Sequence, residues 1–150
     1  MCLPDNQGVY CVVFHLLKPI SQKIGKLGVG DFNSGYYLYC GSAKGRSGLK
    51  GRVQRHLRKE AVRFWHIDYL KPYLEPLMVW YVITRDREEC DLVKALCVFE
   101  YIQYGMKGFG ASDCKHQCKS HLLFAPLSTN LDDVFENLAD GLAGINKCLV

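Results

Sequence analysis

The sequence predicts an α+β fold in which a small antiparallel or mixed central sheet of about three to four strands is flanked by helices. Two observations lead to this prediction. Short segments rich in β-branched and aromatic residues alternate with segments whose apolar residues recur every four positions. No repeat, linker or low-complexity tract interrupts the 150 residues. We therefore expect a single domain over residues 1–150, with a C-terminal helix at about residues 130–145.

Three segments are predicted to form the main strands of the sheet. They are residues 8–14 (GVYCVVF), 36–40 (YYLYC) and 77–84 (LMVWYVIT). The glycine-rich stretch between the first two predicts a hairpin-like excursion with a short strand near residues 24–29. Residues 121–125 predict a last strand at the edge of the sheet.

Four segments are predicted to be helical. From Leu49 onward the apolar residues are four apart, and residues 64–73 continue as a second, shorter helix or turn. Residues 88–104 carry the next apolar stripe. Asn130 precedes two aspartates and is expected to cap the final helix.

The composition excludes several classes of protein. Hydrophobic residues at 49% and charged residues at 23% argue against a disordered chain. No apolar run reaches the roughly 18 residues of a membrane span, and the first residues lack the basic region of a signal peptide. Eight cysteines are too sparse for a disulfide scaffold, so we expect a cytoplasmic protein with reduced cysteines.

The net charge of +4 is unevenly distributed. Between residues 44 and 63 there are eight basic side chains and one acidic residue, Glu60; the basic ones are Lys44, Arg46, Lys50, Arg52, Arg55, Arg58, Lys59 and Arg63. Such a concentration indicates a polyanion as partner, and nucleic acid is the commonest polyanion. The alternative is a helix face that is merely solvated.

Two tyrosines and one helix face are candidates for chemistry. If the strands at residues 8–14 and 36–40 pair antiparallel, Tyr10 and Tyr39 converge at one edge of the sheet. Arg52 and His56 are four apart and therefore share a helix face. A guanidinium can clamp a phosphate, and a nearby imidazole or phenol can orient or deprotonate water.

These residues resemble the motifs of the GIY-YIG nucleases, read here as Gly8-Val9-Tyr10, as Tyr39-Cys40-Gly41-Ser42, and as Leu49, Arg52 and His56. Four longer stretches resemble one group within that superfamily more closely. They are GYYLYCGSA, WHIDYL, EC at residues 89–90, and GFGASDC with SHL after it. That group consists of small prokaryotic GIY-YIG-related proteins of unassigned function, sometimes joined to a DNA base-excision glycosylase. The resemblance covers about residues 8 to 125.

The resemblance implies a DNA phosphodiesterase that uses one divalent cation, Mg²⁺ or Mn²⁺. Tyr10 and Tyr39 would orient water and phosphate, Arg52 would clamp the scissile phosphate, and His56 would be the general base. Glu89 would hold the metal, with Glu88 and Glu100 as alternatives near the same helix. The 28 residues that separate the two motifs exceed the family's usual hairpin.

A second cluster, Cys114, His116, Cys118 and His121, supplies ligand types suited to zinc. Four ligands from eight residues cannot readily surround one ion, so the spacing disfavours structural zinc. We expect instead that Asp113, Cys114, Ser120 and His121 form a buried or cleft-lining loop. His66 joins this second tier of cleft residues, although His66 and Asp68 more simply belong to a capped helix start.

The sequence therefore predicts a metal-dependent DNA endonuclease, with a role in DNA repair or recombination and a protein partner there. The basic residues predicted to contact DNA are Lys44, Arg46, Lys50, Arg55, Lys59 and Arg63. The alternative from another class is a non-catalytic nucleic-acid-binding module that keeps the nuclease fold. A zinc-stapled adaptor is a third, less favoured reading. No membrane partner is expected.

Overall fold

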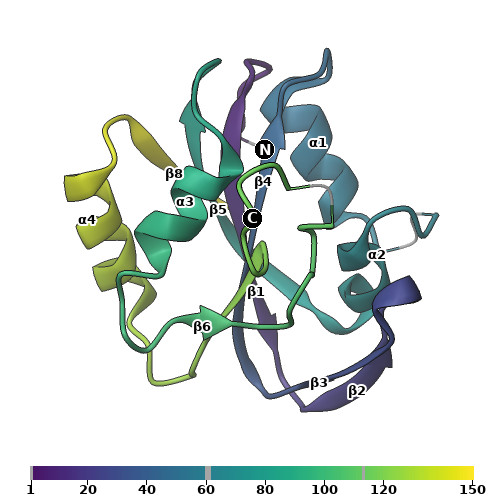
Figure 1. The fold of residues 1–150 in the computed structure, drawn as a ribbon. Helices are drawn as coiled ribbons and strands as arrows, with labels where there is room; N and C mark the ends of the chain where they lie inside the picture. The colour runs from purple at the N-terminus through teal and green to yellow at the C-terminus, as the bar shows by residue number, and fades with distance from the viewer. Residues whose placement is uncertain (1, 60–61, 113) are drawn as a thin grey trace.

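A computed structural model describes residues 2–59, 62–112 and 114–150 and confirms the predicted α+β class (Figure 1). The strands are β1 (Gly8–Leu16), β2 (Ile20–Lys23), β3 (Val29–Phe32), β4 (Gly35–Ala43), β5 (Glu75–Ile83), β6 (Gln103–Tyr104), β7 (Leu122–Ala125) and β8 (Ile145–Leu149). Six of them form one antiparallel sheet in the order β6-β7-β4-β1-β5-β8, and β2 pairs with β3 in a separate hairpin.

The sheet is larger than the three to four strands predicted. The two additions lie at its edges: β6 has only two residues, and β8 is a short, largely exposed segment near the end of the chain. Neither carries the apolar, β-branched pattern by which a buried strand is recognised. The predicted edge strand, now β7, lies inside the sheet between β4 and β6.

The helices are α1 (Gly48–Leu57), α2 (His66–Leu70), α3 (Glu89–Leu96) and α4 (Leu131–Gly141), with 3₁₀ turns η1 (Gly25–Leu27) and η2 (Lys71–Tyr73). The predicted helix over residues 88–104 is shorter than expected, because Phe99 and Ile102 pack on the sheet from turns rather than from a continued helix. As predicted, Asn130 caps α4, and its side chain accepts hydrogen bonds from the backbone N–H groups of Asp132 and Asp133.

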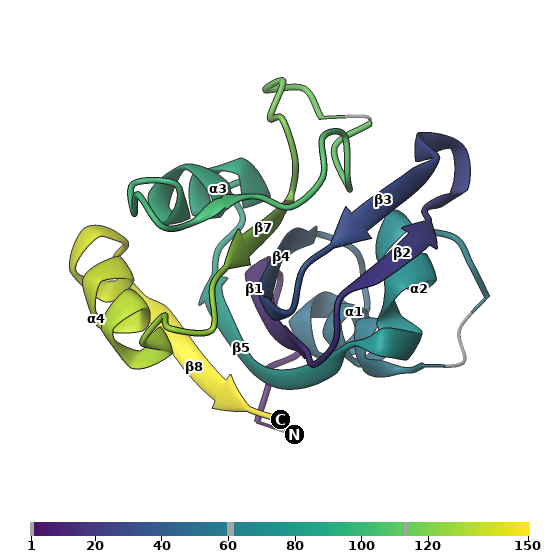
Figure 2. The ribbon, with the colours of Figure 1, turned by 90° about the horizontal axis from the view of Figure 1, so that it is seen from below.

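The two faces of the sheet are covered by different helices, as Figures 1 and 2 show. Alternate residues of β1 enter two cores: Tyr10, Val12 and Phe14 face α1 and α2, whereas Val9, Cys11 and Val13 face α3 and α4. Because both faces of β1 are buried, its sequence reads as a continuous apolar run rather than an alternating one. Among the described helices, none is long and apolar enough to cross a membrane.

The antiparallel pairing of β1 with β4 is confirmed. It sets Tyr10 opposite Gly41 and Val12 opposite Tyr39, so both tyrosine side chains lie on the face covered by α1 and α2. The two tyrosines therefore converge on the central strands of the sheet, and the predicted position at its edge is wrong.

A disulfide joins Cys2 to Cys148 on β8, so the expectation that all eight cysteines are reduced is wrong for this pair. The two ends of the chain meet here (Figure 2). Cysteine density along the sequence could not reveal this contact, because it arises only when β8 joins the sheet beside β5. The other six cysteines are free thiols.

The crosslink closes a loop of almost the whole chain, so its reduction should widen the unfolded ensemble considerably. We expect Cys2→Ser to lower the free energy of unfolding by about 2–4 kcal/mol under non-reducing conditions. Urea unfolding of both proteins with and without a mild reductant measures this. The reductant should lower the free energy of unfolding of the wild type more than that of the variant. An equal decrease in both proteins would contradict the presence of the Cys2–Cys148 disulfide.

Candidate active site

The first feature of the site is a buried contact between α1 and the two central strands. Leu49 and Val53 pack α1 against the sheet. This packing places His56, which follows Val53 by three residues, next to the tyrosines. The Tyr10 hydroxyl and the His56 Nε2 atom share a hydrogen bond of 2.7 Å. The Tyr39 ring meets the His56 ring edge-on, with centroids 5.3 Å apart.

Burial sets the charge state of this group. Tyr10 is 1% exposed, His56 is 2% exposed and Tyr39 is 6% exposed. Burial, reinforced by the positive charges of Lys71 and Arg52, lowers the pKa of His56 to about 3, so the imidazole is neutral near pH 7. Burial likewise raises the pKa of both tyrosines well above the ordinary value.

Gly41 is required by the position of the Tyr10 ring. A Cβ atom at residue 41 would lie 2.4 Å from the Tyr10 hydroxyl oxygen and 2.5 Å from the ring carbon that bears it. Any side chain at this position would displace Tyr10 from His56. The Tyr-Cys-Gly motif thus supplies one tyrosine of the site and the space for the other.

Arg52 lies at the exposed side of this group. Its guanidinium stands 5.0 Å from the centroid of the Trp65 ring, and that of Arg55 stands 4.3 Å from the same centroid. Its positive charge and a hydrogen bond oppose the rise in the pKa of Tyr10, so Arg52 and the Tyr10 hydroxyl are neighbours. Trp65 therefore holds the Arg52 and Arg55 side chains in place through cation–π contacts.

Two carboxylates, Asp68 and Glu89, lie near the site, and Asp68 is paired with Lys71. Glu89 opens α3, its Oε2 atom is buried, and that atom has no hydrogen-bond partner among the described residues. Its negative charge adds to the rise in the pKa of Tyr10 and Tyr39, which places it near both. Glu88 and Glu100, the alternatives, are exposed, and Glu88 is the N-cap of α3.

Glu89 lies near enough to the tyrosines to raise their pKa values, although α3 covers the opposite face of the sheet. The pairing of β4 with β7 ends at Tyr39, and only the backbone bond from Cys40 N–H to the His121 carbonyl continues it. The last part of β4 is therefore open on that side, and α3 begins beside it. Of the five predicted catalytic and metal-binding residues, Tyr10, Tyr39 and His56 are in direct contact, and Arg52 and Glu89 lie near enough to change the pKa of Tyr10.

A buried ion pair supports the segment between α1 and α2. Asp68 accepts hydrogen bonds of 2.8 Å from the backbone N–H groups of Phe64 and Trp65, and it pairs with Lys71 at 3.0 Å. Lys71 also donates to the Arg55 carbonyl at 3.1 Å. The reading of Asp68 as part of a capped helix start is confirmed. Lys71 and Trp65 were not predicted as part of the site, because nothing in the local sequence shows that this lysine will be buried or what the tryptophan ring will contact.

A pocket of about 260 Å³ opens next to the tyrosines. It is lined by Tyr39, Phe64, Trp65, His66, Gly110 and Ser112. His66 Nδ1 accepts a hydrogen bond of 2.8 Å from the backbone N–H of Gly110. Gly110 has a φ of +67°, and a Cβ there would lie 3.2 Å from the Tyr39 ring, so glycine suits this wall of the pocket.

The other second-tier residues lie in the loop before β7. Ser120 is buried, and its hydroxyl donates to the Leu122 carbonyl and accepts from the Leu122 N–H. These bonds stabilise the conformation of the loop, so the hydroxyl does not line the pocket. His121 is also buried, beside Cys114 and Cys90. Asp113 lies outside the described residues.

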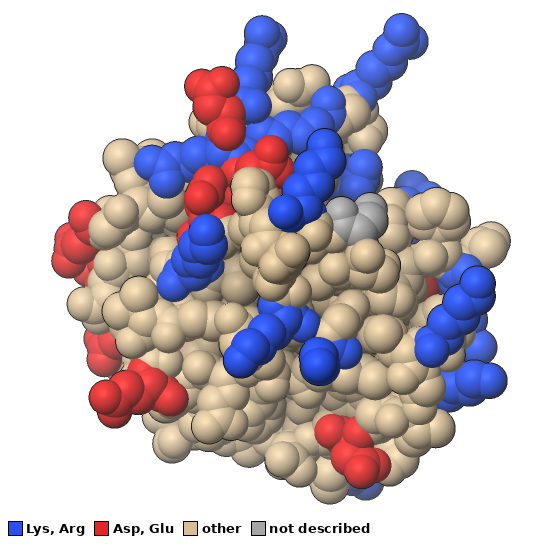
Figure 3. Space-filling view, in the orientation of Figure 1, with Lys and Arg blue, Asp and Glu red and all other residues tan. Residues whose placement is uncertain are grey.

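The basic residues do not form one continuous surface, because several of them contact other parts of the protein. Lys44 donates to the Arg87 carbonyl, Lys59 pairs with Glu75, and Arg63 lies over the Tyr69 ring. Lys50 is half-buried and Arg46 is exposed. In Figure 3, Lys and Arg side chains gather along the upper margin of the face shown, with acidic side chains among them.

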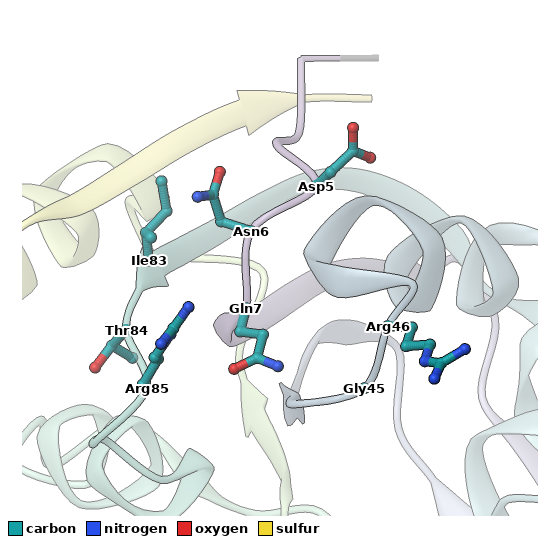
Figure 4. A pocket seen from close by; sticks show the side chains of 8 residues that line it. All are labelled: Asp5, Asn6, Gln7, Gly45, Arg46, Ile83, Thr84 and Arg85. Carbon is teal, nitrogen blue, oxygen red and sulfur yellow. The ribbon is translucent and has the colours of Figure 1, made fainter.

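A second pocket, of about 330 Å³, lies among three segments: the chain before β1, the turn after β4 and the end of β5. Arg46 and Arg85 are among its lining residues, together with Asp5 (Figure 4). Its two guanidinium groups suit an anion, although the carboxylate of Asp5 makes the charge mixed.

Residues 9–143 match the family described as domain of unknown function DUF123. The match spans most of the chain. The protein belongs to this family. No curated protein and no solved structure is significantly similar to the chain.

The buried neutral histidine makes this DUF123 protein sensitive to acid. The unfolded chain binds a proton at His56 below its ordinary pKa of about 6.5, whereas the folded protein does so only near 3. Stability should therefore fall by about 1.4 kcal/mol for each pH unit between about 6 and 4. Urea unfolding across this range measures the slope.

The control is His56→Gln, which should flatten that slope because no group at position 56 then titrates. Asp68 does not confuse the result. Burial would raise its pKa, but the Trp65 and Phe64 N–H groups and Lys71 outweigh burial and lower it. Its contribution is thus lost only below about pH 3.9. An equal slope in both proteins would contradict the assignment.

Proposed function

We propose that this protein is a GIY-YIG-type endonuclease that hydrolyses DNA phosphodiester bonds with one divalent cation. The observation that carries the proposal is the convergence of Tyr10, Tyr39, Arg52, His56 and Glu89 from four separate elements. These are the residues that the resemblance to GIY-YIG nucleases selects. Packing of the hydrophobic core alone does not explain why a carboxylate and an arginine lie beside two tyrosine side chains.

The residues at the site fit a divalent cation. Glu89 offers a buried carboxylate oxygen that has no other partner among the described residues. One carboxylate with several retained waters suits Mg²⁺ or Mn²⁺, since Mg²⁺ gives up its waters reluctantly. Such an ion, when bound, would neutralise charge on the phosphate and lower the pKa of a coordinated water.

The side chains divide the remaining work. Arg52 is half-exposed and held over Trp65, so it can clamp the scissile phosphate and stabilise its developing charge. Neutral His56 can accept the 2.7 Å hydrogen bond from the Tyr10 hydroxyl, which fixes the direction of that O–H group. Because His56 is almost fully buried, we assign it to positioning Tyr10 rather than to direct contact with water.

The surroundings of the site suit a nucleic-acid strand. Phe64 is 74% exposed at the pocket beside Tyr39, and an exposed aromatic ring can stack on an unpaired base. Arg46 and Arg85 line the second pocket, where they can contact the DNA backbone. A role in DNA repair or recombination, with a protein partner, follows from the same resemblance.

The test is cleavage of labelled single-stranded, duplex and branched DNA with Mg²⁺, Mn²⁺ or a chelator. We expect metal-dependent cleavage that falls by about 10²–10³-fold in Arg52→Ala, because a preorganised donor to the phosphate is lost. Glu89→Gln should lose cleavage to a similar or greater extent. Glu88→Gln and Glu100→Gln are matched controls, because they remove exposed carboxylates near the same helix.

The second candidate is a nucleic-acid-binding module that does not cut. The near-complete burial of Tyr10 and His56 favours it, since neither side chain is open to substrate in this state. DNA binding that survives Glu89→Gln, without cleavage under any metal, would establish this alternative. Cleavage that persists in Glu89→Gln would show that another carboxylate holds the metal.

A further inference from the structure

Four metal-binding side chains meet at a place that the proposed active site does not use. Cys90, Cys114, Cys118 and His121 each offer one ligand atom, and these atoms lie within 4.8 Å of one another. The Cys90 sulfur is 3.0 Å from that of Cys118, 3.3 Å from that of Cys114 and 3.6 Å from His121 Nε2. Cys90 comes from α3, and the other three come from the loop between β6 and β7.

The four side chains that meet in the structure are not the four that lie close together in the sequence. In the sequence, His116 stands beside the three loop ligands, and we expected no zinc there because one short segment cannot readily surround an ion. In the structure His116 is exposed, and Cys90, distant in sequence, takes the fourth position. The ligands therefore approach from two sides, which removes the steric objection.

We propose that these four residues hold one structural Zn²⁺ ion. Zinc–sulfur bonds of about 2.3 Å in a tetrahedron separate the sulfurs by about 3.8 Å, so the observed sulfur–sulfur distances of 3.0 and 3.3 Å need only small side-chain movements. Three thiolates and one imidazole form a closed, soft ligand set of the kind that selects zinc. A polynuclear iron–sulfur cluster is disfavoured, because its ligands bind different irons and so stand farther apart.

The environment fits a structural rather than a catalytic ion. Cys90 and His121 are buried, and Cys114 and Cys118 are half-buried, so the set leaves no open position for substrate. The bound set would carry one net negative charge, and Lys94 lies near enough to Cys118 to act on it electrostatically. Residues 105–121 contain no helix or strand in their described part, so a crosslink would hold a loop that has little other regular support.

The proposed zinc site shares chain segments with Glu89 and with the pocket beside Tyr39. Cys90 directly follows Glu89, so an ion at Cys90 fixes the first turn of α3. The same loop carries Gly110, where a Cβ would lie 3.3 Å from that of His121, and whose N–H bonds to His66 in the pocket wall. Zinc would thus fix Glu89 and this wall relative to each other, whether or not the protein cuts DNA.

The test is the metal content of the full-length protein, purified without chelator and measured by elemental analysis. We expect about one zinc per chain, and loss of it in Cys90→Ser and Cys114→Ser. His116→Gln and Cys97→Ser are matched controls that should keep zinc, because both residues lie outside the four-ligand set. Glu89→Gln should also keep zinc, which separates this proposal from failure of the nuclease assignment.

Loss of zinc through misfolding is distinguished by His121→Cys, which exchanges one zinc ligand for another and should retain the ion. Replacement by Co²⁺ should give the visible absorption of a tetrahedral thiolate complex in the wild type and in His121→Cys. Folded protein without zinc, with iron instead, or with a disulfide from Cys90 to Cys114 or Cys118 would overturn the proposal. Loss of zinc in His116→Gln would overturn the ligand assignment.

Discussion

The pairing of β1 with β4 is the constraint on which the rest of the structure depends. Its register places Tyr10 opposite Gly41, and only glycine leaves room for the tyrosine ring. Because side chains alternate along a strand, a shift of β1 by one residue against β4 would turn Tyr10 toward α3 and α4 and separate it from Tyr39. It would also bury the wrong set of β1 residues in each core. One steric fit at Gly41 therefore fixes the register of the central sheet and one half of the candidate site.

Around this pair, charged groups act as structural parts. The buried pair of Asp68 and Lys71 ties the start of α2 to the Arg55 carbonyl on α1. Breaking such a pair leaves an uncompensated charge, so the pair specifies the geometry more than it stabilises the fold. Trp65 depends on this support, and Arg52 and Arg55 lie over its ring. A basic segment that the sequence shows as a simple positive run is in fact divided between internal contacts and solvent.

Two adjacent residues at the start of α3 are proposed to bind two different metal ions. Glu89 and Cys90 are consecutive, and successive residues of a helix point about 100° apart. The Glu89 carboxylate therefore lies near the tyrosines, while the Cys90 sulfur belongs to the thiol cluster. The hard carboxylate oxygen suits Mg²⁺ and the soft thiolates suit Zn²⁺, so the two sites would not compete for the same ion. This arrangement gives the loop before β7 a reason to be rich in cysteine and histidine.

By itself the sequence determined the α+β class, the three long strands, the helix over Leu49 and Val53 and the cap at Asn130. These follow from local periodicity and from short motifs, which act over a few residues. Only the tertiary structure decided the six-stranded size of the sheet, the Cys2–Cys148 disulfide, the burial of Lys71 and the choice of Cys90 over His116. Each of these depends on contacts between residues far apart in the chain, whose spacing in sequence carries no record of their distance in space.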